Sequence, residues 1–460
     1  MRKALKYTVV IGLGLPIALL TTIWLLSAFD SDLSSEVAAL VNRAEAEQIE
    51  HEGNTYFAMR GLHVPPGQNI EAAGRALHAS DQRETEAAKS DGGQERASLA
   101  DAPGTLKFQG ETLNLCTTID DSLYEGDVCK FQADTDRMLR ENTELLRRYY
   151  ELIGYRTYEE PARTFASPDS DLVSLMRLAN VDMERKLDSG QPAEAAALIA
   201  QNLAFWRRAL DGRYRLITEA VFRVNYSYSL LTLSELLWRH PELARSGDVR
   251  AAVGEPVNAH PDRLQAQMDR EFMSVYLARR GSDLLFPDWP GSETHPALKW
   301  VADRLYQRNA TLNAYYACLA TYYAVRRLRG IEYQRAVSRY RDYDIDWGLG
   351  LSINPTGKLA LREICPKRSW FDTLGSSDVI EARRRLVLLE MRLLQSGLPP
   401  SSYPALLLSA GSALHDPVTG KPAKWDADRK IIYFQRDEGC IEGRLWVRLG
   451  PGRNFAECPS

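Results

Sequence analysis

An uncharged stretch near the start of the chain constrains its fold more than any other feature. Residues 7–29 contain no Asp, Glu, Lys or Arg, so all their apolar side chains can lie in hydrocarbon. These 23 residues exceed the roughly 20 that a helix needs to cross a bilayer. The sequence therefore predicts a transmembrane helix, and we expect it to attach the rest of the chain to a lipid bilayer.

The charges that flank this stretch predict its orientation. Asp30 and Asp32 follow it at once, and three cations precede it: Arg2, Lys3 and Lys6. Because positive charge is retained on the cytoplasmic side, we expect a cytoplasmic N-terminus and an exported body. In a Gram-negative bacterium this means a single pass through the inner membrane and a periplasmic body. The alternative is a cleaved signal peptide, but its apolar core is only about 7–15 residues long, and the chain around Ala28 is a poor cleavage site.

Composition divides the chain into five segments. We expect a cytoplasmic stub and anchor at 1–29, a juxtamembrane segment at 30–66, a polar insertion at 67–105, a helical periplasmic domain at 106–400 and a β-rich segment at 401–460. The polar insertion can form a helix but has almost no large apolar residues, so it is most simply a solvated or disordered stretch. The exported length exceeds what one hydrophobic core usually holds, which predicts more than one packed unit.

Apolar residues recur at helical spacing over most of the exported chain, which predicts a mainly α fold. Residues 214–239 are apolar on more than one face, as is typical of a central helix. Near the C-terminus, three short stretches separated by turns predict a small antiparallel sheet. We expect helices at 31–51, 131–155, 172–187, 193–210, 214–239, 261–280, 305–343, 358–364 and 379–398, and strands at 423–426, 430–435 and 444–449.

The six cysteines predict disulfide bonds if the body is exported, although six allow 15 pairings. Our first expectation is a local bond between Cys116 and Cys129, which lie in a turn-rich stretch. A second is a bond between Cys440 and Cys458, which flank the last strand. The sequence leaves two possibilities open for the remaining pair, Cys318 and Cys365: a bond, or a buried free thiol at Cys318.

Several classes of function lack support in the sequence. The net charge of −4 and the pI near 6.1 argue against a nucleic-acid partner. There is no HExxH, CxxC or GxSxG motif, so no zinc, dithiol or serine-nucleophile site is indicated. Residues 354–357 (Asn-Pro-Thr-Gly) resemble a loop of pyridoxal-phosphate aminotransferases, but the lysine motif of those enzymes is missing, and a turn that opens a helix is the better interpretation. We therefore predict no cofactor, no metal and no catalytic residue.

Two features remain as candidate sites. Glu219 and Arg223 lie four residues apart in the most apolar helix, and Glu271 lies among apolar residues. A buried carboxylate needs a partner, so these three residues form either an internal ion pair or a buried polar cluster that lines a pocket. Trp289 lies in a Pro-rich loop, where its ring either docks a protein partner or packs on its own bundle.

A set of short motifs resembles a group of uncharacterised proteobacterial single-pass membrane proteins. The resemblance would cover most of the chain, and it implies an inner-membrane anchor and a helical periplasmic body but no catalytic residue. The motifs are Asn54-x-Tyr56, Gly61-Leu62 with Pro65, the Cys116/Cys129 pair, 204–208 (Ala-Phe-Trp-Arg-Arg), 311–313 (Thr-Leu-Asn) and Asn354-Pro355-x-Gly357.

Two functions of different classes follow. The first is a non-enzymatic, membrane-anchored protein whose helical body binds or scaffolds an envelope or secretion component. The alternative is a periplasmic hydrolase or small-ligand-binding protein with a polar site between central helices. A deep pocket around the candidate polar residues would favour the second function, and an exposed apolar surface would favour the first.

Overall fold

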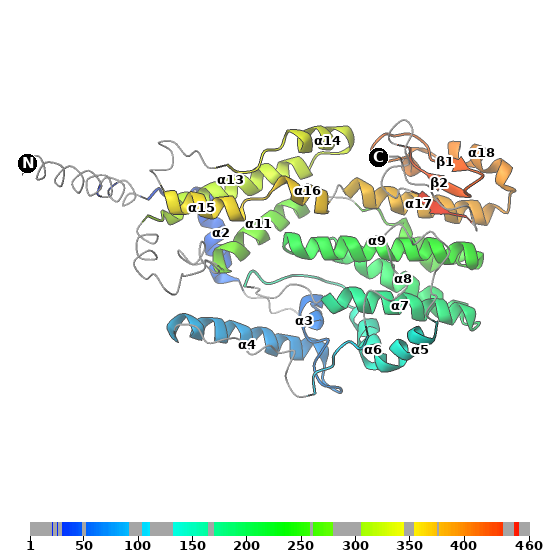
Figure 1. Cartoon of the computed structure of the whole chain (residues 1–460), viewed down its shortest axis with the longest axis horizontal. Helices are drawn as coiled ribbons and strands as arrows, with labels where there is room; N and C mark the ends of the chain where they lie inside the picture. Colours follow the sequence, from blue (N-terminus) through cyan, green and yellow to red (C-terminus); the bar gives the residue numbers. More distant parts are fainter. Residues whose placement is uncertain are drawn as a thin grey trace, which may run out of the picture.

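The fold is mainly helical, with one small antiparallel sheet (Figure 1). This agrees with the predicted fold class, apart from its membrane span. The structure is a computed structural model, and it describes residues 21, 25, 30–47, 52–91, 104–110, 132–163, 170–257, 261–278, 305–344, 354–374, 377–435 and 446–449. No helix within these ranges is long and apolar enough to cross a membrane. The predicted span lies outside them except for Thr21 and Leu25, so it stays a prediction.

The buried apolar side chains form two separate cores, and each core defines a lobe. The small lobe takes its helices from two distant stretches of sequence: α2 (Ser35–Ala46), α11 (Pro261–Ala278), α13 (Arg308–Arg326), α14 (Gly330–Arg339), α15 (Pro355–Ile364) and α16 (Arg368–Leu374). The large lobe contains the remaining elements. Its helices are α3 (Thr55–Arg60), α4 (Ile70–Asp91), α5 (Gln132–Glu141), α6 (Thr143–Leu152), α7 (Ser170–Asp188), α8 (Pro192–Ala209), α9 (Leu216–Arg239), η4 (Pro241–Arg245), α10 (Gly247–Gly254), α17 (Ser377–Ser396), η7 (Pro400–Ser402), α18 (Tyr403–Leu408) and η8 (Ser412–Leu414).

Helix α9 is the centre of the large lobe, as its sequence predicts. It packs against α7, α8 and α17, and it is buried on several faces because apolar side chains surround its axis. Its first residue, Leu216, belongs to the core of the small lobe, whereas Phe222 belongs to the core of the large lobe. The start of α9 therefore lies where the two lobes meet.

The small lobe is closed by a disulfide bond between Cys318 of α13 and Cys365 at the end of α15. The Cα atoms of the two residues are 5.7 Å apart, within the usual range for a disulfide. Of the two possibilities that the sequence left open for this pair, the structure has the bond. The other four cysteines lie outside the described residues.

The polar stretch from residue 67 contains a helix, α4, and its first half is firmly packed. Ile70 is fully buried, and the backbone of α4 contacts that of α3 through two glycines. A methyl group on Gly61 would lie 1.8 Å from the carbonyl oxygen of Ile70, and one on Gly74 would lie 1.7 Å from that of Phe57. We expected a solvated or disordered insertion here. The first half of α4 is instead packed, because close contact between the backbones of α3 and α4 takes the place of contacts between large side chains.

Replacement of Gly61 by alanine should separate α3 from α4. We expect a loss of about 1–3 kcal/mol in the free energy of unfolding, the usual cost of overpacking, measured by urea denaturation. Gly247→Ala is the matched control, since a methyl group there would have no neighbour within 4 Å. Equal stability of the two variants would mean that the glycine contact does not hold the helices together.

Two helices predicted as continuous are each divided in the structure. The predicted helix 131–155 breaks at Asn142. The side-chain amide of Asn142 accepts a hydrogen bond from the N–H of Gln109 and donates one to its carbonyl oxygen (2.8 Å each). The predicted helix 305–343 breaks before Gly330, which has φ of +51° and donates its N–H to Asp378 (3.0 Å). In both cases a remote segment of the chain stabilises the break.

The three predicted strands form one antiparallel sheet in the order β1-β2-β3: β1 (Lys424–Asp426), β2 (Ile431–Tyr433) and β3 (Trp446–Arg448). Trp425 lies opposite Ile432, which in turn lies opposite Val447. Ile432 and Val447 are buried, so the sheet closes over the core beside α17.

Candidate functional site

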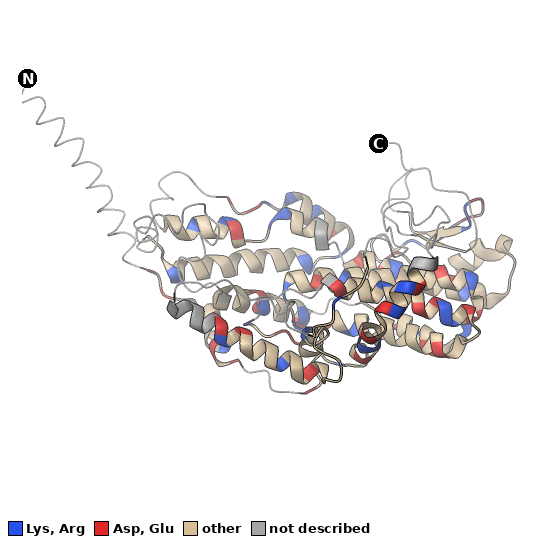
Figure 2. Cartoon of the chain, turned by 60° about the horizontal axis from the view of Figure 1, so that its bottom comes forward, with Lys and Arg blue, Asp and Glu red and all other residues tan. Residues whose placement is uncertain are grey.

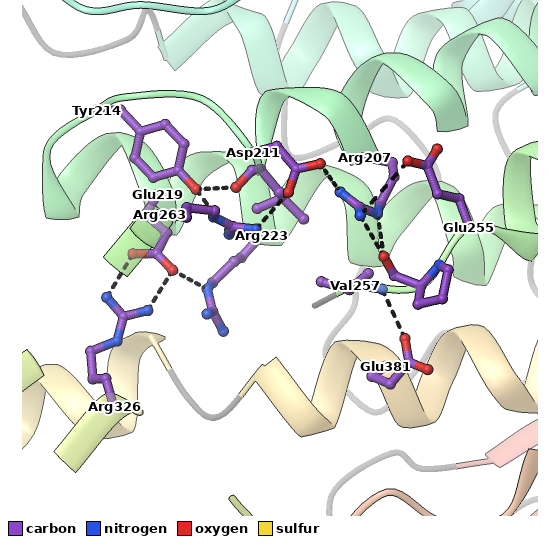
Figure 3. A network of polar contacts seen from close by, with 12 residues as sticks. Arg207, Asp211, Tyr214, Glu219, Arg223, Glu255, Val257, Arg263, Arg326 and Glu381 are labelled. Atoms are coloured by element: carbon purple, nitrogen blue, oxygen red, sulfur yellow. Dashed lines mark hydrogen bonds and ion pairs between the residues drawn. The ribbon is translucent and has the colours of Figure 1, made fainter. Parts of the chain in front are cut away.

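Glu219 of α9 forms the centre of a buried ion cluster (Figure 3). Its carboxylate accepts a hydrogen bond from Arg223 Nε (2.7 Å), one turn further along the helix. It also accepts two bonds from Arg326 of α13, from Nη1 to Oε2 at 2.8 Å and from Nη2 to Oε1 at 2.5 Å. The cluster therefore joins the large lobe to the small lobe.

The two guanidinium groups fix the charge of Glu219. Burial alone would raise the pKa of this carboxyl, but Arg326 and then Arg223 outweigh the effect of burial and hold the pKa well below its usual range. The carboxylate is therefore ionised at neutral pH. A proton donor or acceptor for catalysis needs a pKa near the working pH, so this geometry fits an internal ion pair better than an acid-base site.

Glu271 of α11 has a different position from the one we expected. It accepts a hydrogen bond from the backbone N–H of Leu216 (3.0 Å), the first residue of α9. A carboxylate at this end of a helix is favourable because the exposed N–H groups carry partial positive charge. Burial raises the pKa of Glu271. Its hydrogen bond thus ties α11 of the small lobe to the start of α9.

Further charged contacts, which the sequence analysis missed, continue from this cluster through the large lobe (Figure 3). Arg263 of α11 bonds both Tyr214 OH (3.2 Å) and Asp211 Oδ1 (2.8 Å). Asp211 also accepts a bond from Arg207 Nη1 (2.5 Å). On the far side of this network, Glu381 of α17 accepts the N–H of Val257 (3.0 Å). An arginine within an apolar helix, such as Arg207 in α8, was the only sequence signal for these contacts.

Glu390 of α17 is a second residue that the sequence analysis missed. It is fully buried, and within the described part of the chain neither of its carboxyl oxygens has a partner at good hydrogen-bond geometry. Burial raises the pKa of this carboxyl well above its ordinary value; the Ser234 hydroxyl opposes the increase and Glu235 of α9 adds to it. The buried site therefore favours the protonated form of Glu390.

The protonated state of Glu390 predicts a pH dependence of stability. The unfolded chain loses this proton above about pH 4.5 while the folded chain keeps it, so stability falls as the pH rises toward the folded pKa, by about 1.4 kcal/mol per pH unit. Glu390→Gln should remove this slope, and urea denaturation at pH 5 and pH 7 would measure it. Exposed Glu332→Gln is the control and should keep the wild-type slope. An unchanged slope in Glu390→Gln would contradict the assignment.

Three of the motifs that carry the family resemblance lie at buried polar contacts. Asn54 Oδ1 accepts the N–H of Tyr56 (3.1 Å), and Trp206 donates to Tyr149 OH (3.1 Å). Asn354 Oδ1 accepts the N–H of Gly357 (3.1 Å), which confirms that this motif is a turn that opens a helix. These polar groups cap helices or join them, so their visible roles are structural.

The other candidate, Trp289, lies outside the described residues. Within the described ranges, no group of three or more His, Cys, Asp or Glu side chains is placed to hold a metal ion. No protein-family model matches the sequence, and no curated protein or solved structure matches it. The resemblance to the proteobacterial group therefore stays a prediction.

Proposed function

We propose that this chain is a membrane-anchored, exported protein whose helical body binds another protein of the cell envelope. Its N-terminal helix would hold it in the inner membrane with the body in the periplasm. The disulfide bond between Cys318 and Cys365 supports export, because such bonds persist in oxidising compartments and are rare in the cytosol.

The candidate polar residues support a binding role rather than catalysis. Glu219 is only 1% exposed and holds two arginines, and Glu271 bonds the start of a helix. These side chains already have internal partners, which they would have to leave in order to contact a substrate. Breaking such a buried pair costs about 3–5 kcal/mol.

The observation that carries the proposal is an uncharged segment with exposed leucines at one end of the large lobe. Residues 396–414, which we call the uncharged end segment, contain no Asp, Glu, Lys or Arg. Within it Leu398 is 44% exposed and Leu408 is 67% exposed, the highest value among the large apolar side chains of the described residues. Exposed large apolar side chains on an uncharged segment are a feature of protein interfaces.

The position of this segment favours a protein partner over the lipid of the anchor. Helix α18 lies at the opposite end of the molecule from α2 and α15 (Figure 1). It contains no charged residue, whereas Lys, Arg, Asp and Glu occur on helices along the rest of the molecule (Figure 2). Buried Tyr403 and Leu407 hold the segment on the lobe. Its partner should therefore present an apolar, uncharged face away from the membrane surface.

Chemical crosslinking in intact cells would test this proposal. The tagged full-length protein is purified from membranes, and the captured proteins are identified by mass spectrometry. We expect one reproducible envelope protein that Leu408→Asp no longer captures. Ile331→Asp is the matched control, because Ile331 is 53% exposed but lies on the small lobe. Recovery of the protein alone, or equal capture by both variants, would contradict the proposal.

A further inference from the structure

The chain is clamped to the small lobe immediately after the predicted membrane span. Asp30 Oδ2 accepts the N–H of Asn309 (2.7 Å), and its Oδ1 accepts that of Ala310 (3.0 Å). Asn313 donates from Nδ2 to the carbonyl oxygen of Asp32 (2.9 Å) and accepts the N–H of Ser34 at Oδ1 (3.0 Å). Residues 30–34 are thus held on the first turns of α13, and we call these four hydrogen bonds the clamp.

The chain that follows this clamp is part of the small lobe itself. Ser34 Oγ accepts the N–H of Val37 and so caps α2. Val37, Leu40 and Ala44 are 0%, 3% and 2% exposed, and they pack within the core of the small lobe. The body is therefore rigidly connected to Asp30, with no free linker between them.

The start of α15 lies beside the start of α13. Asn354 Oδ1 accepts the N–H of Gln307 (2.9 Å), and its Nδ2 donates to Thr311 Oγ1 (3.0 Å). The two helices run in the same direction, because their later residues Cys318 and Cys365 are bonded. The first turns of both helices thus share one end of the small lobe with Asp30.

The length of the chain places this end at the lipid surface. The predicted span ends at residue 29, and one residue extends at most about 3.6 Å. The headgroup layer on each side of a bilayer is about 5–8 Å thick, so Asp30 cannot leave that layer if residue 29 lies at the edge of the hydrocarbon. The first turn of α13 is bonded to Asp30 and must lie at the same depth.

We propose that this end of the small lobe, which we call the membrane-proximal face, packs directly against the lipid headgroups. It comprises Asp30, Asp32, Tyr306, Arg308 and Leu359. Leu359 is 38% exposed, Arg308 is exposed and Tyr306 is partly buried. Tyrosine is enriched at membrane interfaces. The Arg308 guanidinium donates to Tyr276 OH (2.8 Å), which fixes the start of α13 on α11. This inference rests on the membrane anchor in the proposed function, and it means that the clamp fixes the orientation of the whole body on the bilayer.

Photocrosslinking to lipid would test the orientation. The full-length protein is reconstituted in vesicles of phosphatidylethanolamine and phosphatidylglycerol, with p-benzoylphenylalanine in place of Leu359 or, as the control, in place of Leu408. Both positions are exposed, so neither replacement disturbs a core. After irradiation, mass spectrometry should find lipid attached at position 359 and only background at position 408. Equal yields would overturn the inference.

Two further measurements separate this inference from the proposed function. Asp30→Ala combined with Asn313→Ala should reduce the lipid adduct at position 359 several-fold while the protein stays in the membrane, and an unchanged adduct would refute the role of the clamp. If the unmodified protein is released from membranes by alkaline carbonate, the anchor itself is wrong and the inference fails with it. If the protein stays in the membrane but positions 359 and 408 give equal yields of lipid adduct, the anchor stands and only the proposed orientation is overturned.

Discussion

Replacement of Glu219 by glutamine is expected to lower the free energy of unfolding by about 3–5 kcal/mol, the usual cost of leaving a buried charge without its partner. Arg223 and Arg326 would keep their charges in a site that is closed to water. Because Arg326 comes from the other lobe, the variant should also weaken the junction between the lobes. Chemical denaturation followed by circular dichroism would measure the change.

Two comparisons make this prediction specific. Glu332→Gln removes an exposed carboxylate from α14 and should change stability by less than about 0.5 kcal/mol. The pKa of Glu219 is lower in the folded protein than in the unfolded chain. Its contribution to the free energy of unfolding is therefore present above about pH 4.5 and is lost as the pH falls further, because the unfolded chain then binds more protons. Equal stability of the glutamine variant and the wild type at pH 7 would show that the cluster does not hold the lobes together.

Removal of the bond between Cys318 and Cys365 is expected to cost about 4 kcal/mol from the entropy of loop closure. The two residues are 47 positions apart, so the bond restricts a long segment of the unfolded chain that includes all of α14. Both cysteines should be replaced by alanine, since a single replacement leaves a free thiol. Urea denaturation of the double variant and the wild type would measure the loss.

The matched comparison for this prediction is Cys116→Ala combined with Cys129→Ala. If that predicted pair is bonded, it closes a shorter segment and should contribute less, about 3 kcal/mol. Peptide mapping without reduction should find the peptides of Cys318 and Cys365 linked. Free thiols at both positions in the protein purified from membranes would contradict the bond and weaken the support for export.

The helical fold could be predicted because local patterns determine most of it. The apolar stripe of Leu145, Tyr149 and Leu152 is buried where the spacing places it. The breaks at Asn142 and before Gly330 could not be predicted, since each depends on contacts with a distant segment. The packing of α4 on α3 was also not predicted. It depends on Gly61 and Gly74, which let the two backbones touch because they have no side chain, and a pattern of apolar side chains gives no sign of such a contact.

The ion pair of Glu219 with Arg223 could be predicted because it lies within one helix at a spacing of four residues. Arg326, the third member, is 107 residues from Glu219, and no pattern in the sequence joins them. The prediction also grouped Glu271 with Glu219, whereas its hydrogen bond goes to the start of α9. Single-chain sequence patterns identify buried charges but not their long-range partners.

The most direct test of the proposed binding role is photocrosslinking from the uncharged end segment in intact cells. The full-length protein would carry p-benzoylphenylalanine in place of Leu408 or, as the control, in place of exposed Ile331. We expect one discrete adduct with an envelope protein from position 408, none from position 331, and loss of that adduct when Leu398→Asp is added. No adduct from position 408, or the same adducts from both positions, would contradict a partner-docking role for this surface.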